Sequence, residues 1–254
     1  MIRSLIVSAL VATLALPAGA SPTPPARAAR PAAPPPPPLS QVLARTFRLY
    51  GGVDAILAVE GLRLSGTIAD ATTEPRSRPR LERLLHLPDR YRSAVSLGGI
   101  ERETLILDGS RAFRDGAEVT GLVRADQIRL EAARTFLPGA LARGREALVD
   151  RGEAFRAGRQ VRMVELPLHE RATLTAEIDP GSGRILRAVT RVAGRETSVS
   201  FRRFRPVEGI LFPFAEDQEA RDGKRTVLVE RVELVRGAAI HDRSLVEGGS
   251  GTTP

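Results

Sequence analysis

The sequence from Arg195 to Val235 reads RETSVSFRRFRPVEGILFPFAEDQEARDGKRTVLVERVELV. Val199 and Phe201 alternate with polar neighbours, which is the two-residue period of a strand with one buried face. A second apolar run follows and is expected to end at Pro213. The Asp-Gly pair within residues 221–224 favours a tight hairpin, because such turns need positive φ angles. The stretch therefore predicts three consecutive antiparallel strands that share one apolar face.

The last of these strands changes phase along its length. Val227 and Val229 point to one side, whereas Val232 and Leu234 fall on the other if the alternation is strict. The pattern predicts either a β-bulge near Glu230 or a strand that is covered on both faces.

Working outward, the same period recurs upstream and is interrupted by segments of helical spacing. A sheet of about ten strands with one apolar face must curl to cover that face. The sequence thus predicts an α+β fold, in which a curved antiparallel sheet forms an incomplete β-barrel with helices as a plug or lid. Strands are expected near residues 62–68, 81–87, 91–97, 100–108, 111–119, 161–168, 174–178 and 185–192, and helices over 40–50, 53–59 and 126–137, the last lying across the sheet.

The two ends of the chain have a different composition. Residues 1–20 have a positive start, an apolar run and a small-residue site, which predict a signal peptide cleaved after Ala20 and export to the periplasm. An uncleaved anchor is disfavoured, because the apolar run is short for a membrane span. Residues 21–38 are rich in Pro and Ala and predict a disordered linker, residues 39–243 form the folded domain, and residues 244–254 form a disordered tail.

The charge balance is basic, with 38 Lys and Arg against 30 Asp and Glu, a formal net charge of +8. Nucleic acid is not an expected partner, because the arginines are interleaved with acids and the chain has no tryptophan for base stacking. A solvated arginine surface is the preferred interpretation, and an anionic lipid surface or an acidic partner stays open. The absence of cysteine excludes disulfides and thiol chemistry.

Candidates for catalysis are few and lack a recognisable spacing. Scattered histidines predict no metal site, and carboxylates on strands are expected to face solvent opposite arginines rather than to act as acid and base. We therefore expect no enzyme, no metal and no cofactor, with a hydrolase built on these groups as the alternative. The residues considered are His86, His169 and His241, and Glu165, Glu177 and Asp179.

A curled sheet lined by Leu, Val and Ile, with few large aromatic side chains, leaves room for a cavity. In an exported protein without a catalytic set, such a cavity indicates a carrier for an acyl chain. The alternative is that the helices fill the sheet entirely as ordinary core. The predicted lipid-binding residues are Leu62, Leu64, Tyr91, Val95, Ile106, Ile128, Phe136, Leu174, Ile178, Phe201 and Phe212.

The order of several short motifs resembles that of the periplasmic outer-membrane lipoprotein-sorting, or LolA-like, proteins. The motifs are Tyr50–Ala55 before Leu62–Gly66, then Pro88–Arg92, Leu107–Gly109, Ile178–Pro180 with Gly183, and Phe204–Pro213. The resemblance implies an incomplete antiparallel barrel with helices as a lid and an apolar interior that holds acyl chains of lipids or lipoproteins. It assigns no individual site residue.

The resemblance also implies an alternative role, because some relatives are envelope sensors or scaffolds that bind proteins. Such relatives usually carry a second C-terminal domain, and the chain ends soon after Val235, so we expect the carrier role. The expected partners are lipid or lipoprotein acyl chains, with envelope membrane proteins as further candidates, and the expected state is a monomer.

Overall fold

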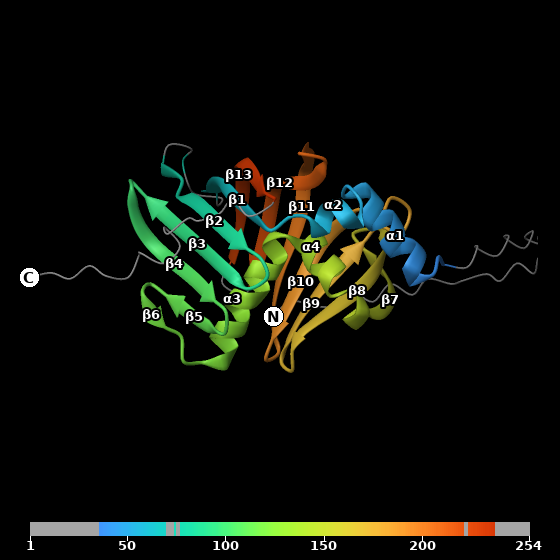
Figure 1. The fold of residues 1–254 in the computed structure, drawn as a ribbon, viewed down its shortest axis with the longest axis horizontal. Coiled ribbons are helices and arrows are strands. Elements are labelled where there is room, and N and C mark those ends of the chain that lie inside the picture. The colour runs from blue at the N-terminus through green and yellow to red at the C-terminus, as the bar shows by residue number, and fades with distance from the viewer. Residues whose placement is uncertain (1–35, 70–73, 75–76, 221–222, 237–254) are drawn as a thin grey trace, which may run out of the picture. The chain divides into compact units, whose positions relative to one another are not determined.

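The computed structural model describes residues 36–69, 74, 77–220 and 223–236. The helices and strands described here all lie within residues 37–254 (Figure 1). The predicted signal peptide, most of the linker and the C-terminal tail lie outside the described residues.

The helices are α1 (Leu39–Leu49), α2 (Val53–Leu57), α3 (Leu122–Thr135) and α4 (Leu137–Arg143), followed by a 3-10 turn, η2 (Arg145–Ala147). The strands are β1 (Gly61–Ala69), β2 (Arg80–His86), β3 (Arg90–Leu97), β4 (Ile100–Asp108), β5 (Arg111–Arg114), β6 (Ala117–Glu118), β7 (Val149–Arg156), β8 (Arg159–His169), β9 (Ala172–Ile178), β10 (Ile185–Val192), β11 (Arg195–Val207), β12 (Ile210–Ala220) and β13 (Gly223–Val235).

All these strands form one antiparallel sheet of 13 strands in the order β6-β5-β4-β3-β2-β1-β13-β12-β11-β10-β9-β8-β7. The first strand of the chain, β1, lies in the middle of the sheet, and the strands that follow extend to one edge at β6. The chain then crosses to the other edge through α3 and α4 and returns from β7 to β13, which lies beside β1. The crossing helices must therefore traverse the sheet, as Figure 1 shows for α3 and α4. The predicted fold class, α+β with one open antiparallel sheet and helices on it, is confirmed.

The sheet curls around α3. This helix contacts β2, β4 and β5 on one side and β9 and β10 on the other. In a flat sheet, β4 and β10 would be about 34 Å apart, seven spacings of ~4.8 Å, whereas a helix with its side chains is only about 10 Å wide. Only a strongly curved sheet brings both sets of strands to one helix.

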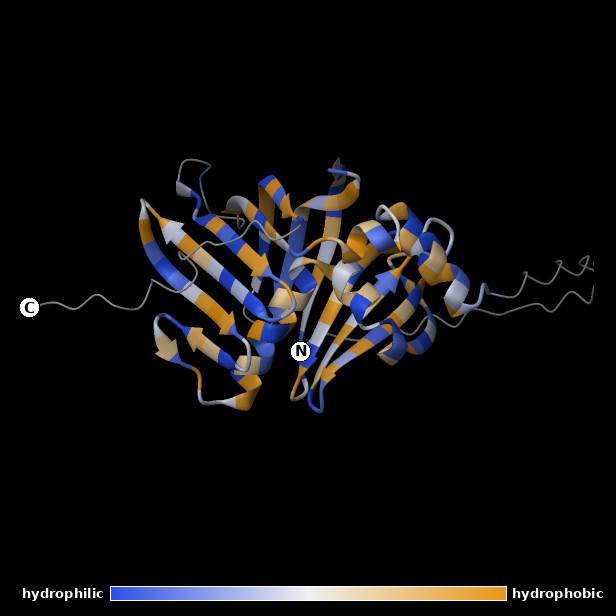
Figure 2. Ribbon diagram, viewed as in Figure 1, coloured by the Kyte–Doolittle hydropathy of each residue, from blue (hydrophilic) through white to orange (hydrophobic). Residues whose placement is uncertain are grey.

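The alternation seen in the sequence matches the two faces of the sheet, and Figure 2 shows the strands banded accordingly. The predicted bulge is also confirmed. Ser65 of β1 pairs with Arg231 and Gly66 pairs with Val229, so Glu230 is the extra residue. Because the bulge resets the phase, Val227, Val229 and Val232 are all buried. A Cβ on Gly66 would lie 2.2 Å from the carbonyl oxygen of Leu228, so this close approach requires glycine.

Pro213 does not end a strand. It lies inside β12, paired with Phe204, and the strand continues to Ala220. Proline is tolerated there because β13 pairs with β12 only from Ala215 onward, so no donor is needed on that side. The longer strand carries Glu216 into the sheet, which the sequence interpretation did not foresee.

Helix boundaries differ from the expectations by up to a turn. Helix α3 begins at Leu122 rather than at Asp126, and Asp126 is buried and accepts a hydrogen bond from Arg129 Nη1 at 3.0 Å.

Candidate ligand cavity and its buried charge cluster

Part of the inner face of the sheet is filled by helices. Val42 of α1, Ile56 of α2 and Leu141 of α4 are fully buried in the apolar core. Helix α1 also packs tightly on the turn between β9 and β10, because a Cβ on Gly183 would lie 2.6 Å from the amide nitrogen of Thr46. This part of the molecule is ordinary close-packed interior.

A cavity of about 550 Å³ lies between α3 and the sheet. Its walls come from β1 to β5, from β10 to β13 and from the face of α3 that carries Ile128. Small-molecule and lipid sites are commonly about 300–1,000 Å³, so the space is of ligand size. The helices therefore do not fill the curled sheet completely. The apolar lining consists of Ile68, Leu81, Val95, Leu105, Val119, Ile128, Leu130, Val192, Val199, Ala220 and Val227.

The structure brings two of the predicted lipid-binding residues, Val95 and Ile128, to the cavity wall. Ile106 pairs with Arg92 and so lies on the sheet face opposite to its neighbour Leu105, which lines the cavity. The others are buried in the apolar core rather than at the wall: Leu62, Leu64, Tyr91, Phe136, Leu174, Ile178, Phe201 and Phe212.

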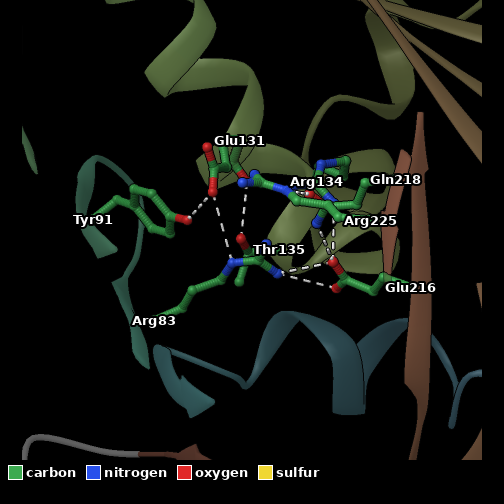
Figure 3. A network of polar contacts seen from close by, with 8 residues as sticks. All are labelled: Arg83, Tyr91, Glu131, Arg134, Thr135, Glu216, Gln218 and Arg225. Carbon is green, nitrogen blue, oxygen red and sulfur yellow. Dashed lines mark hydrogen bonds and ion pairs between the residues drawn. The ribbon is translucent and has the colours of Figure 1, made fainter. Parts of the chain in front are cut away.

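At its deep end the cavity is lined by Arg83, Glu131 and Arg134, which form a buried charge cluster with Glu216 (Figure 3). Arg83 Nη1 on β2 donates to both carboxylate oxygens of Glu216 on β12, at 3.1 and 3.0 Å. Arg134 Nη1 on α3 donates to Glu216 Oε2 at 3.1 Å. Arg83 Nε lies 3.7 Å from Glu131 Oε1, too far for a hydrogen bond. Since Arg83 is 1% exposed and Glu216 3%, the cluster ties α3 to two strands inside the fold.

Neutral side chains extend the cluster in two directions. Tyr91 donates from its hydroxyl to Glu131 Oε1 at 3.1 Å. On the other side, Gln218 Nε2 donates to Glu216 Oε2 at 3.0 Å, and Arg225 Nε donates to Gln218 Oε1 at 2.8 Å (Figure 3). The chain of contacts leads from the buried cluster to an exposed arginine near the start of β13.

The protonation states follow from these contacts. Burial alone would raise the pKa of the Glu216 carboxyl, but the guanidiniums of Arg83 and Arg134 outweigh it and lower that pKa to about 2. Burial works against the charged form of Arg83, yet Glu216 raises the pKa of Arg83 above its usual range. Burial followed by the Glu131 charge raises the pKa of Tyr91, so its phenol stays a donor at neutral pH. The buried ion pair of Glu216 and Arg83 is therefore fully charged.

Sequence reasoning missed the cluster, although its signal is visible in hindsight. Arg83 stands in phase with the buried Leu81 and Leu85 of β2. On α3, polar residues recur three to four positions apart on the cavity side, where an apolar stripe is usual. These in-phase polar residues are Arg124, Gln127, Glu131 and Arg134.

The catalytic candidates are dispersed. Glu165 pairs with Arg151 Nη2 at 2.7 Å, and Glu177 pairs with Arg187 Nη1 at 3.3 Å, so arginines face both as expected, although both carboxylates are buried. His169 Nδ1 lies 3.8 Å from Asp126 Oδ2.

The described residues contain no group of three or more His, Cys, Asp or Glu that could hold a metal ion. His86 Nδ1 lies 3.1 Å from the carbonyl oxygen of Leu87, and His241 is outside the described residues. Among the helices of the described ranges, none has the length and apolar character needed to cross a bilayer.

Comparison with known proteins identifies solved structures with a similar fold. No family model matches the sequence, and no curated protein matches it. The structure of a LolA superfamily protein from Nitrosomonas europaea superposes with a TM-score of 0.50 at 12% identity, covering 77% of this chain and 93% of that one.

Two other solved structures are similar at lower scores. A DUF1329 family protein from Desulfovibrio piger gives 0.49 at 10% identity, covering 80% of this chain and 95% of its own. The structure titled "putative outer membrane lipoprotein-sorting protein domain", from Vibrio parahaemolyticus, gives a TM-score of 0.45 at 10% identity, covering 80% of this chain and 97% of that one. The similarity to the Nitrosomonas europaea structure confirms, at the level of architecture, the resemblance noted in the sequence: the chain has the fold of a LolA superfamily protein, an open antiparallel sheet with helices on its inner face.

Proposed function

We propose that the protein is a non-enzymatic carrier of the periplasm that binds acyl chains of a lipid or lipoprotein in the cavity under α3. The observation that carries this proposal is the cavity itself, about 550 Å³ with apolar side chains from both the sheet and the helix. The LolA-like fold supports it, because a curled sheet around one helix supplies such a space.

The free energy of removing hydrocarbon from water favours an acyl chain against the apolar part of the cavity wall. Each methylene removed from water contributes about 0.8 kcal/mol, so eight buried methylenes contribute roughly 6 kcal/mol before the cost of association is subtracted. Val95, Leu105 and Val227 offer such a surface along the sheet, and Ile128 offers it from the helix. No covalent step is needed for this role.

Two adjacent residues on β4 make a sharp test. Leu105 lines the cavity, whereas Ile106 lies on the opposite face of the sheet, and the chain contains no tryptophan. The variants Leu105→Trp and Ile106→Trp therefore each carry one fluorophore, on the two sides of the same strand. Titration with a dibrominated stearic acid, which quenches nearby tryptophan, should quench Leu105→Trp in a saturable manner and leave Ile106→Trp nearly unchanged.

The opposite result is equally informative. Equal quenching of both variants would indicate nonspecific adsorption, and absence of saturable quenching in Leu105→Trp would contradict the carrier proposal. Solvent extraction of the purified wild-type protein, followed by mass spectrometry, gives an independent measurement that needs no substitution. Co-purified lipid is expected, in amounts that fall in a variant whose cavity is narrowed by Val199→Phe.

A further inference from the structure

The cavity is electrically asymmetric. Nine of its lining residues are charged, and seven of these are positive, which leaves an excess of five positive charges along the wall. The positive residues are Arg83, Arg114, Arg124, Arg134, Arg195, Lys224 and Arg225, and the negative ones are Glu103 and Glu131.

The deep end is compensated within the fold. Arg83 and Arg134 face Glu216 and Glu131 in the buried charge cluster, two charges of each sign. A charged ligand group placed at this end would have to displace a buried carboxylate, which is costly because the remaining charge would lose its partner. The deep end therefore has no net charge to offer a ligand.

The excess lies at the mouth. Arg114 pairs with Glu103 at 2.9 Å, and Lys224 pairs with Glu219 at 2.8 Å. Neither Arg124 nor Arg195 forms an ion pair with any residue that the structure describes.

The third uncompensated cation is Arg225, whose hydrogen bond goes to the neutral amide of Gln218. We call Arg124, Arg195 and Arg225 the mouth arginines. All three are exposed, in contrast to the buried Arg83 and Arg134.

The topology gathers these side chains at one opening. Strands β11 and β13 are both antiparallel to β12, so they run in the same direction and begin at the same end of the sheet. Arg195 is the first residue of β11, and Arg225 is the third of β13. Arg124 lies in the first turn of α3, which contains no acidic residue. Three separate elements thus present uncompensated positive charge around one cavity.

We infer that the ligand is an anionic amphiphile, whose carboxylate or phosphate sits among the mouth arginines while its hydrocarbon passes Val95 and Leu105 toward the buried charge cluster. This inference rests on the proposed carrier function and adds the class of ligand to it. Arginine favours both groups, because its planar fork donates two parallel hydrogen bonds to carboxylate or phosphate oxygens.

Competition binding measures separately how the ligand's head-group charge and its hydrocarbon chain contribute to affinity. Leu105→Trp loaded with dibrominated stearic acid serves as the reporter, and recovery of fluorescence measures displacement. Hexadecanoic acid and hexadecyl phosphate should displace the probe about tenfold more effectively than hexadecanol or hexadecyltrimethylammonium. Comparing the first two assigns the preference to a carboxylate or to a phosphate. Inorganic phosphate and acetate, which lack a chain, should not displace it.

Substitution of each mouth arginine, with Arg231 on β13 as the control for Arg225, tests their role. Arg225→Gln, Arg195→Gln and Arg124→Gln should each weaken hexadecanoic acid binding roughly threefold, in line with exposed ion pairs, and should leave hexadecanol unchanged. Arg231→Gln, on the outer face of β13 beyond the bulge, should change neither. The preference for the acid should also shrink as salt is raised, because the mouth is solvent-exposed.

The outcomes distinguish the two proposals. If hexadecanol binds as tightly as hexadecanoic acid and the arginine variants bind both like wild type, the ligand-charge inference is overturned while the carrier function stands. If no long-chain compound binds Leu105→Trp, the carrier function itself is contradicted. If inorganic phosphate displaces the probe as well as hexadecyl phosphate does, the mouth is a plain anion site and the inference is wrong.

Discussion

At the scale of the residue, Glu216 balances two buried guanidiniums, those of Arg83 and Arg134. Replacing it with glutamine keeps the shape but removes the charge that compensates both. We expect Glu216→Gln to lower the free energy of unfolding by about 3–5 kcal/mol, because it leaves buried positive charge without a partner. Urea denaturation with the far-ultraviolet circular dichroism signal measures this change.

The control for that substitution is another glutamate on the same sheet. Glu82 on β2 pairs with Arg63 across to β1, and the Arg63 side chain is 56% exposed. Glu82→Gln should change the free energy of unfolding by less than about 0.5 kcal/mol, as exposed pairs do. Equal effects of the two substitutions would mean that the buried charge cluster contributes no more than a surface pair.

The same carboxyl makes stability depend on pH in a defined direction. The pKa of Glu216 is about 2 in the folded protein against an ordinary value of 4.5. Its contribution is therefore fully present above pH 4.5 and is lost as the pH falls toward 2, because the unfolded chain takes up the proton first. The difference in unfolding free energy between wild type and Glu216→Gln should narrow over this interval, as urea titrations at several pH values would show. A difference that stays constant would refute the assignment.

At the scale of the element, the bulge in β13 and the glycine opposite it act together. Gly66→Ala places a Cβ against the carbonyl oxygen of Leu228, so we expect a loss of about 1–3 kcal/mol in the free energy of unfolding. Ser65→Ala, one position earlier on the same strand, adds no atom and should stay within about 0.5 kcal/mol. Thermal unfolding of both variants makes the comparison. Equal shifts in the midpoint temperature would argue against a close approach of β1 to β13 at Gly66.

The sequence predicts individual strands well, but it does not predict which residues the folded sheet brings together. A period of two suffices to find β1 and β13, and the phase change reduces the choice to a bulge near Glu230 or a strand covered on both faces, because both are local patterns. The pairing of β1 with β13 shows that the bulge is correct. The cavity wall and the buried charge cluster are not local. Arg83 meets Glu216 across 133 positions of sequence, and only the curl of the sheet decides which apolar residues border empty space. Phe136 and Val95 therefore looked alike in the sequence, although one is core and the other is wall.

At the scale of the whole molecule, the unit of residues 37–254 should fold without what precedes it. We expect a chain that lacks residues 1–36 to unfold at the same urea midpoint as one that lacks only the predicted signal peptide. Removing residues 37–50 as well, which include α1, should destabilise the protein strongly, because Val42 and Tyr50 are buried and the hydroxyl of Tyr50 accepts a hydrogen bond from the Ile185 amide at 3.2 Å. A lower midpoint on removal of residues 1–36 alone would show that this segment contributes to the fold.

The pairing of β1 with β13 has a consequence for biosynthesis. Strand β1, which begins at residue 61, has a hydrogen-bonded neighbour on both sides only once β13, which ends at residue 235, has been synthesised. A nascent chain from which the final strand has not yet emerged presents two bare backbone edges, at β1 and at β12, and such edges readily pair with foreign strands. Until this strand is available, the polypeptide stays open and accessible to chaperones. A stop codon anywhere before residue 223 should consequently yield aggregates rather than a shorter working protein.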